Sequence, residues 1–378
     1  MTLAGARPIT APIEGSERKQ DQMIIDCDVH QNYDSTDEFI PYLPGIYREV
    51  VTDQGVLVPT SGYFNAPKPA ARTDLADEPN PHPRNYNGRH QGYDYDSLRE
   101  NHLDLWNIDY ALLTGSMYVG SAIPDADYAA AFCRAINDWS LEEWIARDSR
   151  FIMAMTVSTA DPQLAIEEID RIAERPEVVA LILPTGSHTP YGNRFFHPIW
   201  EACNRHRLPV FVHPGLEGAG MAGPPTGAGY PTYYLETRMA RPQMAMAHCA
   251  SLICEGVFEK FPDLKFAFIE VDQFWVPGFM WHMDADWKSL RAQTPWVKLL
   301  PSEYFRRHIR IGSQPLEEPE RPEQLLEMLD AMHAEETLIY CSDWPHWDWD
   351  DPATTFPRLP ERLHKRIFSE NARELLGL

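Results

Sequence analysis

The sequence lacks several features that would assign it to a common class of proteins. Basic residues are scarce: 33 lysines and arginines stand against 56 aspartates and glutamates, which gives a formal net charge of −23. So acidic a chain repels nucleic acid and anionic membranes, and neither is expected as a partner. An anionic substrate is not excluded, because a bound cation can make one site locally positive. No apolar run reaches the roughly 18 residues that a transmembrane helix needs, so no membrane span is expected.

Cysteine is also sparse and forms no recognisable motif. None of the six cysteines stands in a C-x-x-C pair, and most lie within apolar runs. We interpret them as small buried side chains of a protein from a reducing compartment. Residues 1–22 are polar and contain no apolar segment of the kind found in signal peptides. We therefore expect a cytoplasmic protein whose residues 1–22 form an N-terminal arm.

A regular alternation of short apolar segments and helical patterns begins at Ile24. Repeated β–α alternation is typical of a parallel sheet, and eight such units predict a (β/α)8 TIM barrel. An open doubly wound sheet is the alternative, but no glycine fingerprint follows the first strand. The later strands are predicted at 108–115, 151–157, 178–183, 209–213, 265–270, 308–312 and 338–342, and the main helices at 38–50, 96–107, 125–147, 196–206, 235–261, 321–333 and 361–376.

The alternation is interrupted once, after the first predicted strand. Between about residues 55 and 95 the periodicity disappears, and prolines, glycines and asparagines dominate. Such a long irregular stretch in a compact protein is typical of a lid or an interface arm. We expect one domain over residues 23–378, with residues of about 31–95 as an insertion.

Polar side chains follow several of the predicted strands. Asp28 and His30 end the first strand, and residues two apart in a strand point to the same face. His213 ends the fifth strand, Glu270 the sixth and Asp343 the eighth. A barrel gathers its functional groups at these strand ends, and mixed imidazole and carboxylate ligands suit Zn²⁺, Mn²⁺ or Fe²⁺. Taken singly, each residue has a simpler explanation as a hydrogen-bonded histidine or a turn cap.

Four motifs in this order are similar to those of the amidohydrolase-related family. They are I-D-x-D-x-H at 25–30, F-V-H-P at 211–214, G-V-F-E-K-F-P-D-L-K at 256–265 and S-D-W-P-H at 342–346. Residues 368–376 resemble the C-terminal helix of the same family, so the resemblance covers 24–378. This branch of the amidohydrolase superfamily includes aminocarboxymuconate semialdehyde decarboxylase and resorcylate decarboxylase.

The resemblance implies a metal-dependent barrel with Asp28, His30, His213 and Asp343 as the metal ligands. It favours one Zn²⁺, with Mn²⁺, Fe²⁺ or a second metal as alternatives. One departure concerns catalysis, because the decarboxylases of the family carry a histidine where this chain has Glu270. A glutamate can act as the base or can bind a second metal.

Further residues are candidates for catalysis or for contacts with a substrate. His248 is the candidate replacement for the missing histidine, with a buried helix histidine as the alternative. His346 can hydrogen-bond a ligand or a substrate. Trp344, beside Asp343, can wall an apolar or aromatic substrate, and its alternative is rim packing. The remaining candidates for substrate binding, each with simple solvent exposure as its alternative, are His188, Arg84 and Arg89.

Three functions remain open at this point. The first is a metal-dependent hydrolase or decarboxylase acting on a small carboxylated, cyclic or aromatic compound. The second is a dioxygen-activating monooxygenase component with two iron ions. The third is a non-catalytic, metal-binding partner subunit. A small-molecule substrate and assembly into a homo-oligomer, or a hetero-oligomer with a paralogous chain, are expected.

Overall fold

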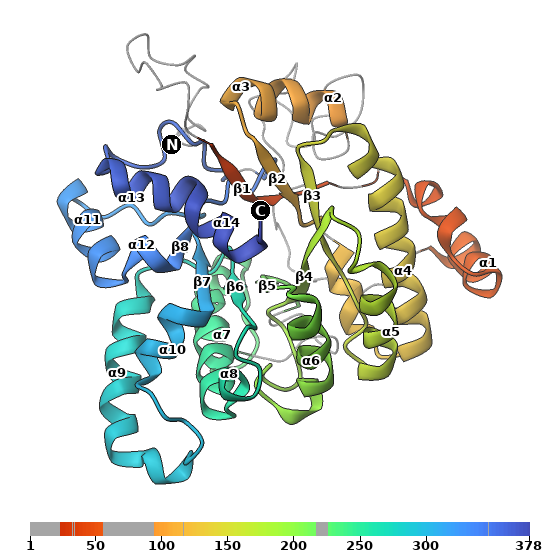
Figure 1. The fold of residues 1–378 in the computed structure, drawn as a ribbon. Coiled ribbons are helices and arrows are strands. Elements are labelled where there is room, and N and C mark those ends of the chain that lie inside the picture. The colour runs from red at the N-terminus through yellow and green to blue at the C-terminus, as the bar shows by residue number, and fades with distance from the viewer. Residues whose placement is uncertain are drawn as a thin grey trace.

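The computed structural model describes residues 23–55, 94–216 and 226–378, without 32, 34, 116 and 347. Within these residues, eight parallel strands form one sheet. The strands follow one another around the sheet in sequence order (Figure 1). The predicted (β/α)8 barrel is therefore confirmed. Their bounds are β1 Ile25–Val29, β2 Tyr110–Leu113, β3 Phe151–Met155, β4 Val178–Pro184, β5 Val210–His213, β6 Phe266–Phe268, β7 Ile309–Gly312 and β8 Leu338–Ile339.

The ring closes between β1 and the segment that follows β8. The amide of Cys27 donates to the carbonyl of Tyr340 at 3.0 Å, and the amide of His30 donates to the carbonyl of Trp344 at 2.7 Å. In the opposite direction, the amide of Asp343 donates to the carbonyl of Asp28 at 3.1 Å. Closure satisfies the backbone groups that an open edge would expose. It also brings Asp28 and Asp343 side by side.

The strands are continuous apolar runs because the side chains on both of their faces are buried. In β6, Phe266 and Phe268 pack in the layer between strands and helices, while Ala267 packs inside the ring. A strand covered on both faces needs apolar residues at every position. Small and branched residues fill the interior, among them Ile25, Cys27, Leu112, Ile152, Ile182, Ile339 and Cys341.

Helices surround the strands on the outside of the barrel (Figure 1). Their bounds are α1 Gly45–Gln54, α2 Tyr95–Leu98, α3 Asp104–Trp106, α4 Ala126–Glu143, α5 Pro162–Ile172, α6 His197–His206, α7 Tyr234–Cys254, α8 Val257–Lys260, α9 Trp275–Leu290, α10 Pro301–His308, α11 Pro322–Ala331, α12 Ala334–Thr337, α13 Glu361–Lys365 and α14 Asn371–Leu376. Two π-helical turns, Arg99–Leu103 and Arg366–Glu370, join α2 to α3 and α13 to α14. Among the described residues, no helix is long and apolar enough to cross a membrane.

Some predicted elements differ from the observed ones. The single helix predicted over 235–261 is two helices, because Gly256 adopts a φ of +71° and interrupts the chain between α7 and α8. The helix predicted over 38–50 is instead two 3₁₀ turns, Thr36–Glu38 and Ile40–Tyr42, followed by α1. The N-terminal arm and residues 56–93 of the insertion lie outside the described residues, so the expected domain limits stay a prediction.

Candidate metal centre

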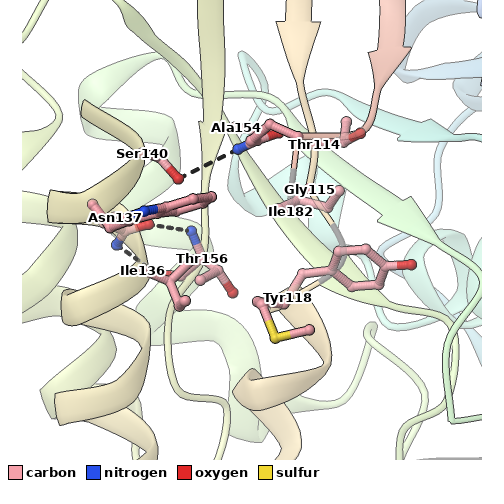
Figure 2. A pocket seen from close by; sticks show the side chains of 12 residues that line it. Thr114, Gly115, Tyr118, Ile136, Asn137, Ser140, Ala154, Thr156 and Ile182 are labelled. Atoms are coloured by element: carbon pink, nitrogen blue, oxygen red, sulfur yellow. Dashed lines mark hydrogen bonds between the residues drawn. The ribbon is translucent and has the colours of Figure 1, made fainter. Parts of the chain in front are cut away.

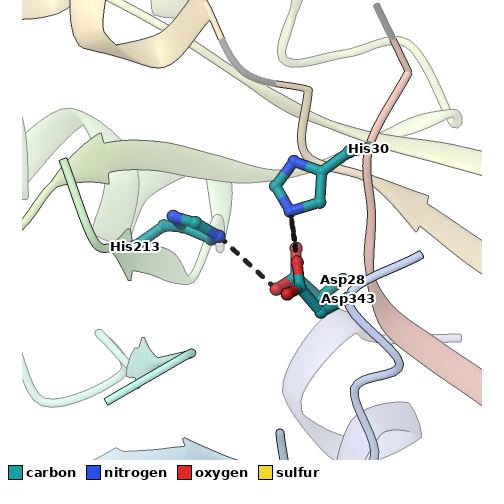
Figure 3. A group of neighbouring side chains, drawn as sticks. All are labelled: Asp28, His30, His213 and Asp343. Atoms are coloured by element: carbon teal, nitrogen blue, oxygen red, sulfur yellow. Dashed lines mark ion pairs between the residues drawn. The ribbon is translucent and has the colours of Figure 1, made fainter. Parts of the chain in front are cut away.

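Two carboxylates and two imidazoles from three distant segments meet at the C-terminal end of the barrel (Figure 3). The side chains are Asp28 and His30 at the end of β1, His213 at the end of β5 and Asp343 after β8, and all four are buried. His30 Nε2 lies 2.9 Å from Asp343 Oδ1 and 3.3 Å from Asp28 Oδ1. His213 Nε2 lies 3.5 Å from Asp28 Oδ2. One donor atom from each residue lies within 4.8 Å of the others.

Hydrogen bonds on the far side of each imidazole fix which nitrogen carries the proton. His30 Nδ1 lies 2.7 Å from the carbonyl oxygen of Gly115, which can only accept, so Nδ1–H donates. His213 Nδ1 contacts the hydroxyl oxygen of Tyr118 at 2.5 Å, and this hydroxyl donates onward to the carbonyl of Pro214 at 2.7 Å. Both imidazoles therefore present the lone pair of Nε2 to the cluster, as metal-binding histidines do.

The inward-facing donor atoms fit a cation. Asp28 Oδ2, His30 Nε2, His213 Nε2 and both carboxylate oxygens of Asp343 are buried and lack a hydrogen-bond partner among the described residues. Lone pairs that face one another in a buried site cost several kcal/mol unless a positive charge lies between them. Two carboxylates and two neutral imidazoles are a donor set suited to Zn²⁺ or Mn²⁺.

The pKa values report the same negative field. Burial lowers the pKa of His30, but the carboxylates of Asp28 and Asp343 outweigh burial and raise it to about 10. Burial likewise lowers the pKa of His213, and Asp28 and Glu270 reverse that shift. Burial would raise the pKa of Asp343, yet His346 and His30 hold it well below its usual range. The carboxylates thus create a strongly negative potential at both imidazoles, which is the field that a cation would compensate.

Backbone irregularities turn the ligands toward this point. The register between β1 and β2 shifts between Asp26 and Val29, as an extra residue in β1 requires, and such bulges re-aim side chains beside active sites. Asp28 consequently reaches the cluster, while Asp26 contacts His102 behind it. Asp343 and Glu270 have φ values of +61° and +56°, an uncommon backbone conformation that collects at functional sites.

Glu270 lies at the edge of the metal cluster, two residues beyond the end of β6. Its Oε2 is 3.3 Å from His213 Nε2, and its Oε1 accepts a hydrogen bond from Arg241 Nη1. A second guanidinium, that of Arg238, lies 3.7 Å from the same Oε1. Sequence reasoning missed both arginines; the available signal was their i, i+3 spacing, which places both on one face of α7.

The arginines also account for a second acidic group. Glu270, Asp343 and Asp348 each have a carboxylate oxygen within 4.8 Å of the others. Arg238 Nη2 contacts Asp348 Oδ2 at 2.6 Å, and Arg241 contacts Glu270. Guanidinium charge already compensates these carboxylates, so a second metal is not needed to explain why they can lie together.

His346 is the outermost of the predicted catalytic residues. Its Nδ1 lies 2.5 Å from Asp343 Oδ1, and its ring stacks on His30 with centroids 4.2 Å apart. The side chain retains 25% of its exposure, whereas that of Asp343 has none. His346 therefore connects the buried ligand to the surface.

His248 is held by the backbone instead of facing the ligands. Its Nε2–H donates to the carbonyl of Thr185 at 2.8 Å, and its Nδ1 accepts from the amide of Tyr191 at 3.1 Å. Its ring stacks on Tyr191, and burial lowers its pKa to about 4. These contacts join α7 to the loop after β4, so we do not retain His248 as a catalytic candidate.

The predicted substrate-binding residues do not gather at the site in the described part of the chain. Trp344 is fully buried and stacks on His102 behind the ligands, so it cannot wall a substrate there. His188 is exposed in the loop after β4. Arg84 and Arg89 lie outside the described residues.

A small cavity lies beside the cluster, between the ends of β2–β4 and helix α4 (Figure 2). Its volume is about 20 Å³, which is room for a single water molecule and far too little for an aromatic ring. Thr114, Gly115 and Tyr118 line it, and the same residues hold Asp28, His30 and His213. The cavity belongs to the support of the ligands, and we do not place a substrate in it.

Comparison with known proteins gives a match over nearly the whole chain. The Amidohydro_2 family model, described as amidohydrolase, matches residues 25–378. The gamma-resorcylate decarboxylase of Rhizobium sp. (strain MTP-10005) is 24% identical over 307 residues, covering 77% of this chain and 89% of that protein.

Two solved structures share the fold. The 5-carboxyvanillate decarboxylase from Sphingomonas paucimobilis has a TM-score of 0.65 at 20% identity, covering 94% of this chain and 99% of that one. A dihydroxybenzoic acid decarboxylase from Polaromonas sp. JS666, solved with manganese and the inhibitor 2-nitroresorcinol, has a TM-score of 0.64 at 18% identity, covering 94% and 97%. These relatives give no support to the alternative of a di-iron monooxygenase component.

Proposed function

This chain belongs to the amidohydrolase family, and we propose that it is a metal-dependent decarboxylase of a small aromatic carboxylate. The observation that carries the proposal is the buried cluster of Asp28, His30, His213 and Asp343, whose unpartnered donor atoms face one point. The names of the relatives supply the substrate class: gamma-resorcylate, 5-carboxyvanillate and dihydroxybenzoate decarboxylases.

The four ligands would hold one divalent cation. When bound, such a cation supplies a Lewis acid that attracts and polarises substrate oxygen atoms. We favour Mn²⁺ over the Zn²⁺ expected from the sequence, because the Polaromonas decarboxylase was solved with manganese and half of this donor set is carboxylate. Tyr118 and Gly115 keep the two imidazoles in the tautomer that binding requires.

Two arginines would draw the anionic substrate to the site. With a net charge of −23, the protein as a whole repels carboxylates. Arg238 and Arg241 place two guanidinium groups beside the ligands, where they form ion pairs with Asp348 and Glu270. Their positive charges reduce the negative potential that an approaching carboxylate meets at the site. Arg241 additionally holds Glu270 by an ion pair, which keeps that carboxylate facing His213.

Decarboxylation replaces the lost carboxyl group with a proton, so the site must deliver one. Glu270 is our candidate acid–base group, because its Oε2 lies at the edge of the cluster while Arg241 holds the other oxygen. His346 is half-buried and contacts Asp343, so it can exchange protons between solvent and the centre. Each role is a proposal that a single substitution tests.

The proposal is tested with purified protein that has been reloaded with Mn²⁺. It is incubated with 2,6-dihydroxybenzoate, 5-carboxyvanillate and benzoate, and released carbon dioxide and the aromatic product are quantified. We expect decarboxylation of at least one hydroxylated benzoate, and none by His213→Ala. Release of no carbon dioxide from either hydroxylated acid, together with hydrolysis of aryl esters or lactones, would reassign the protein as a hydrolase.

A further inference from the structure

A second buried polar cluster lies directly behind the metal ligands and has no role in the proposed reaction. Its members are Asp26 in β1, His102 in the π-helical turn Arg99–Leu103, and Ser342 after β8. All three residues are fully buried. A carboxylate in such a place needs strong hydrogen bonds to compensate its lost hydration.

One oxygen of Asp26 joins the two segments that carry the aspartate ligands. Oδ1 accepts from the amide of Asp28 at 3.2 Å and from the amide of Ser342 at 2.9 Å. The first amide belongs to a ligand, and the second belongs to the residue that precedes the ligand Asp343. A single carboxylate oxygen therefore fixes the spacing between β1 and the end of β8 at the level of the metal centre.

The other oxygen of Asp26 is held by His102. His102 Nε2–H donates to Oδ2 at 2.7 Å, which fixes the rotation of the carboxylate about its own axis. The ring of His102 also stacks on Trp344, with centroids 5.0 Å apart and an angle of 20°. The carbonyl of Trp344 in turn accepts from the amide of His30 at 2.7 Å. His102 thus supports three ligand-bearing positions and touches none of the ligand atoms.

A π-helical turn brings His102 into this position. The wider turn of a π-helix displaces side chains from ordinary α-helical spacing and is frequent at functional sites. Here it buries His102 and Leu103 side by side between α2 and α3.

We propose that Asp26 and His102 are positioning residues, and that this pair sets the affinity of the centre for its divalent cation. The inference rests on the proposed metal centre, but not on the identity of the substrate. Groups that orient the ligands of a metal typically contribute roughly 10–100-fold to its affinity. Asp26 accepts hydrogen bonds from two backbone amides beside the ligands, and His102 stacks on Trp344. The pair therefore orients the ligands through the backbone that carries them and not through contacts with the ligand side chains.

The test compares Mn²⁺ affinities of chelator-treated full-length variants by calorimetry, and the Mn²⁺ spectrum by electron paramagnetic resonance. His102→Phe keeps a stacking ring but removes the donor, and His102→Gln keeps an N–H donor. His308→Phe is the matched control, because His308 is also buried, stacks on Phe258 and donates to the carbonyl of Leu264, away from the ligands. We expect roughly 10–100-fold weaker binding and an altered spectrum for His102→Phe. We expect values near wild type for His102→Gln and for the control.

The outcomes separate this inference from the proposed function. Wild-type protein that binds none of Mn²⁺, Zn²⁺ and Fe²⁺ would overturn the metal centre and everything built on it. Tight binding by wild type, with His102→Phe within threefold of it and an unchanged spectrum, would overturn the positioning role alone. If His102→Phe does not fold, Asp26→Asn replaces it, because an amide nitrogen at the Oδ2 position cannot accept from His102. Equal affinity of Asp26→Asn and wild type would likewise overturn the inference.

Discussion

Glu270 shows how one residue combines several constraints at the metal centre. Its backbone is left-handed, one carboxylate oxygen is bound by Arg241, and the other lies 3.3 Å from His213 Nε2. A glutamine at this position can still accept from Arg241 but cannot take up a proton. We expect Glu270→Gln to fold, to bind one metal ion and to lose roughly 100–10,000-fold in turnover.

Metal content, melting temperature and turnover of this variant are measured on the same preparation. Glu259→Gln is its control, since Glu259 forms an ion pair with Lys298 instead of facing the centre. Undiminished turnover would remove Glu270 from the mechanism. Loss of one of two bound metal ions would instead make Glu270 a ligand of a second metal.

His248 predicts a pH dependence of stability. Burial lowers its pKa from 6.5 to about 4 in the folded protein, so the unfolded chain binds the proton more tightly. The contribution of the neutral, buried His248 to the free energy of unfolding is fully present above pH 6.5. It is lost as the pH falls toward 4, by roughly 1 kcal/mol per pH unit. His248→Gln, which can keep both backbone hydrogen bonds, should reduce the fall in melting temperature between these pH values. His308, whose pKa burial also lowers to about 4, keeps its own share of that fall.

The matched control for this prediction is His282→Gln, because the side chain of His282 is 80% exposed. Its pH profile should follow that of wild type. Identical profiles for His248→Gln and wild type would show that another group governs acid stability in this window.

The sequence predicted the ligands because these residues lie at the ends of strands. The alternation of side chains along a strand fixes the face to which each one points, and the ends of all the barrel strands lie at one rim. Asp28, His30, His213 and Asp343 do meet in the structure. Arg238 and Arg241 could not be found in this way, because helix periodicity assigns them a face but not a neighbour. The substrate role expected for Trp344 failed for a related reason: closure of β8 onto β1 turns it away from the site, against His102.

The break between α7 and α8 is the clearest difference between a predicted element and the observed one. Apolar periodicity runs through residues 235–261, but Gly256 has a φ of +71° and a Cβ there would lie 2.5 Å from Trp296 Cδ1. We expect Gly256→Ala to lower the free energy of unfolding by about 1–3 kcal/mol, from left-handed strain and the clash with Trp296.

Gly278→Ala provides the contrast. Gly278 lies inside α9, and a Cβ at that position would have no neighbour within 4 Å. Alanine has a higher helix propensity than glycine, so the free energy of unfolding of this variant should rise by about 0.5–1 kcal/mol. Urea unfolding measures both changes, and equal stabilities for the two variants would contradict the structural role of Gly256.

The type of each element could be predicted because a strand buried on both faces is a continuous apolar run, while an outer helix buried on one face has helical periodicity. The residues at which elements end were harder to predict. The strand predicted over 265–270 ends at Phe268, because Glu270 leaves the ladder to face the site. The strand predicted over 338–342 ends at Ile339, since Asp343 and Trp344 pair with β1 through isolated contacts instead of a regular ladder.

The metal centre and the closure of the barrel are one feature of the folded molecule. The ligands come from β1, β5 and the segment after β8, so they assemble only when the ring is complete. A cation that binds the folded state and not the unfolded chain stabilises the ring. The gain is about 4 kcal/mol when the free metal is ~1,000-fold above its dissociation constant.

Thermal unfolding of chelator-treated protein during titration with Mn²⁺, with bound metal counted by plasma emission, tests directly whether the four side chains hold a cation. We expect one ion per chain and a melting temperature that rises with the Mn²⁺ concentration. We also expect both effects to be lost in His213→Ala and Asp343→Ala. Protein that binds no Mn²⁺, Zn²⁺ or Fe²⁺ and melts at the same temperature throughout would show that these side chains form no metal centre. Full metal occupancy in both alanine variants would show that the metal lies elsewhere.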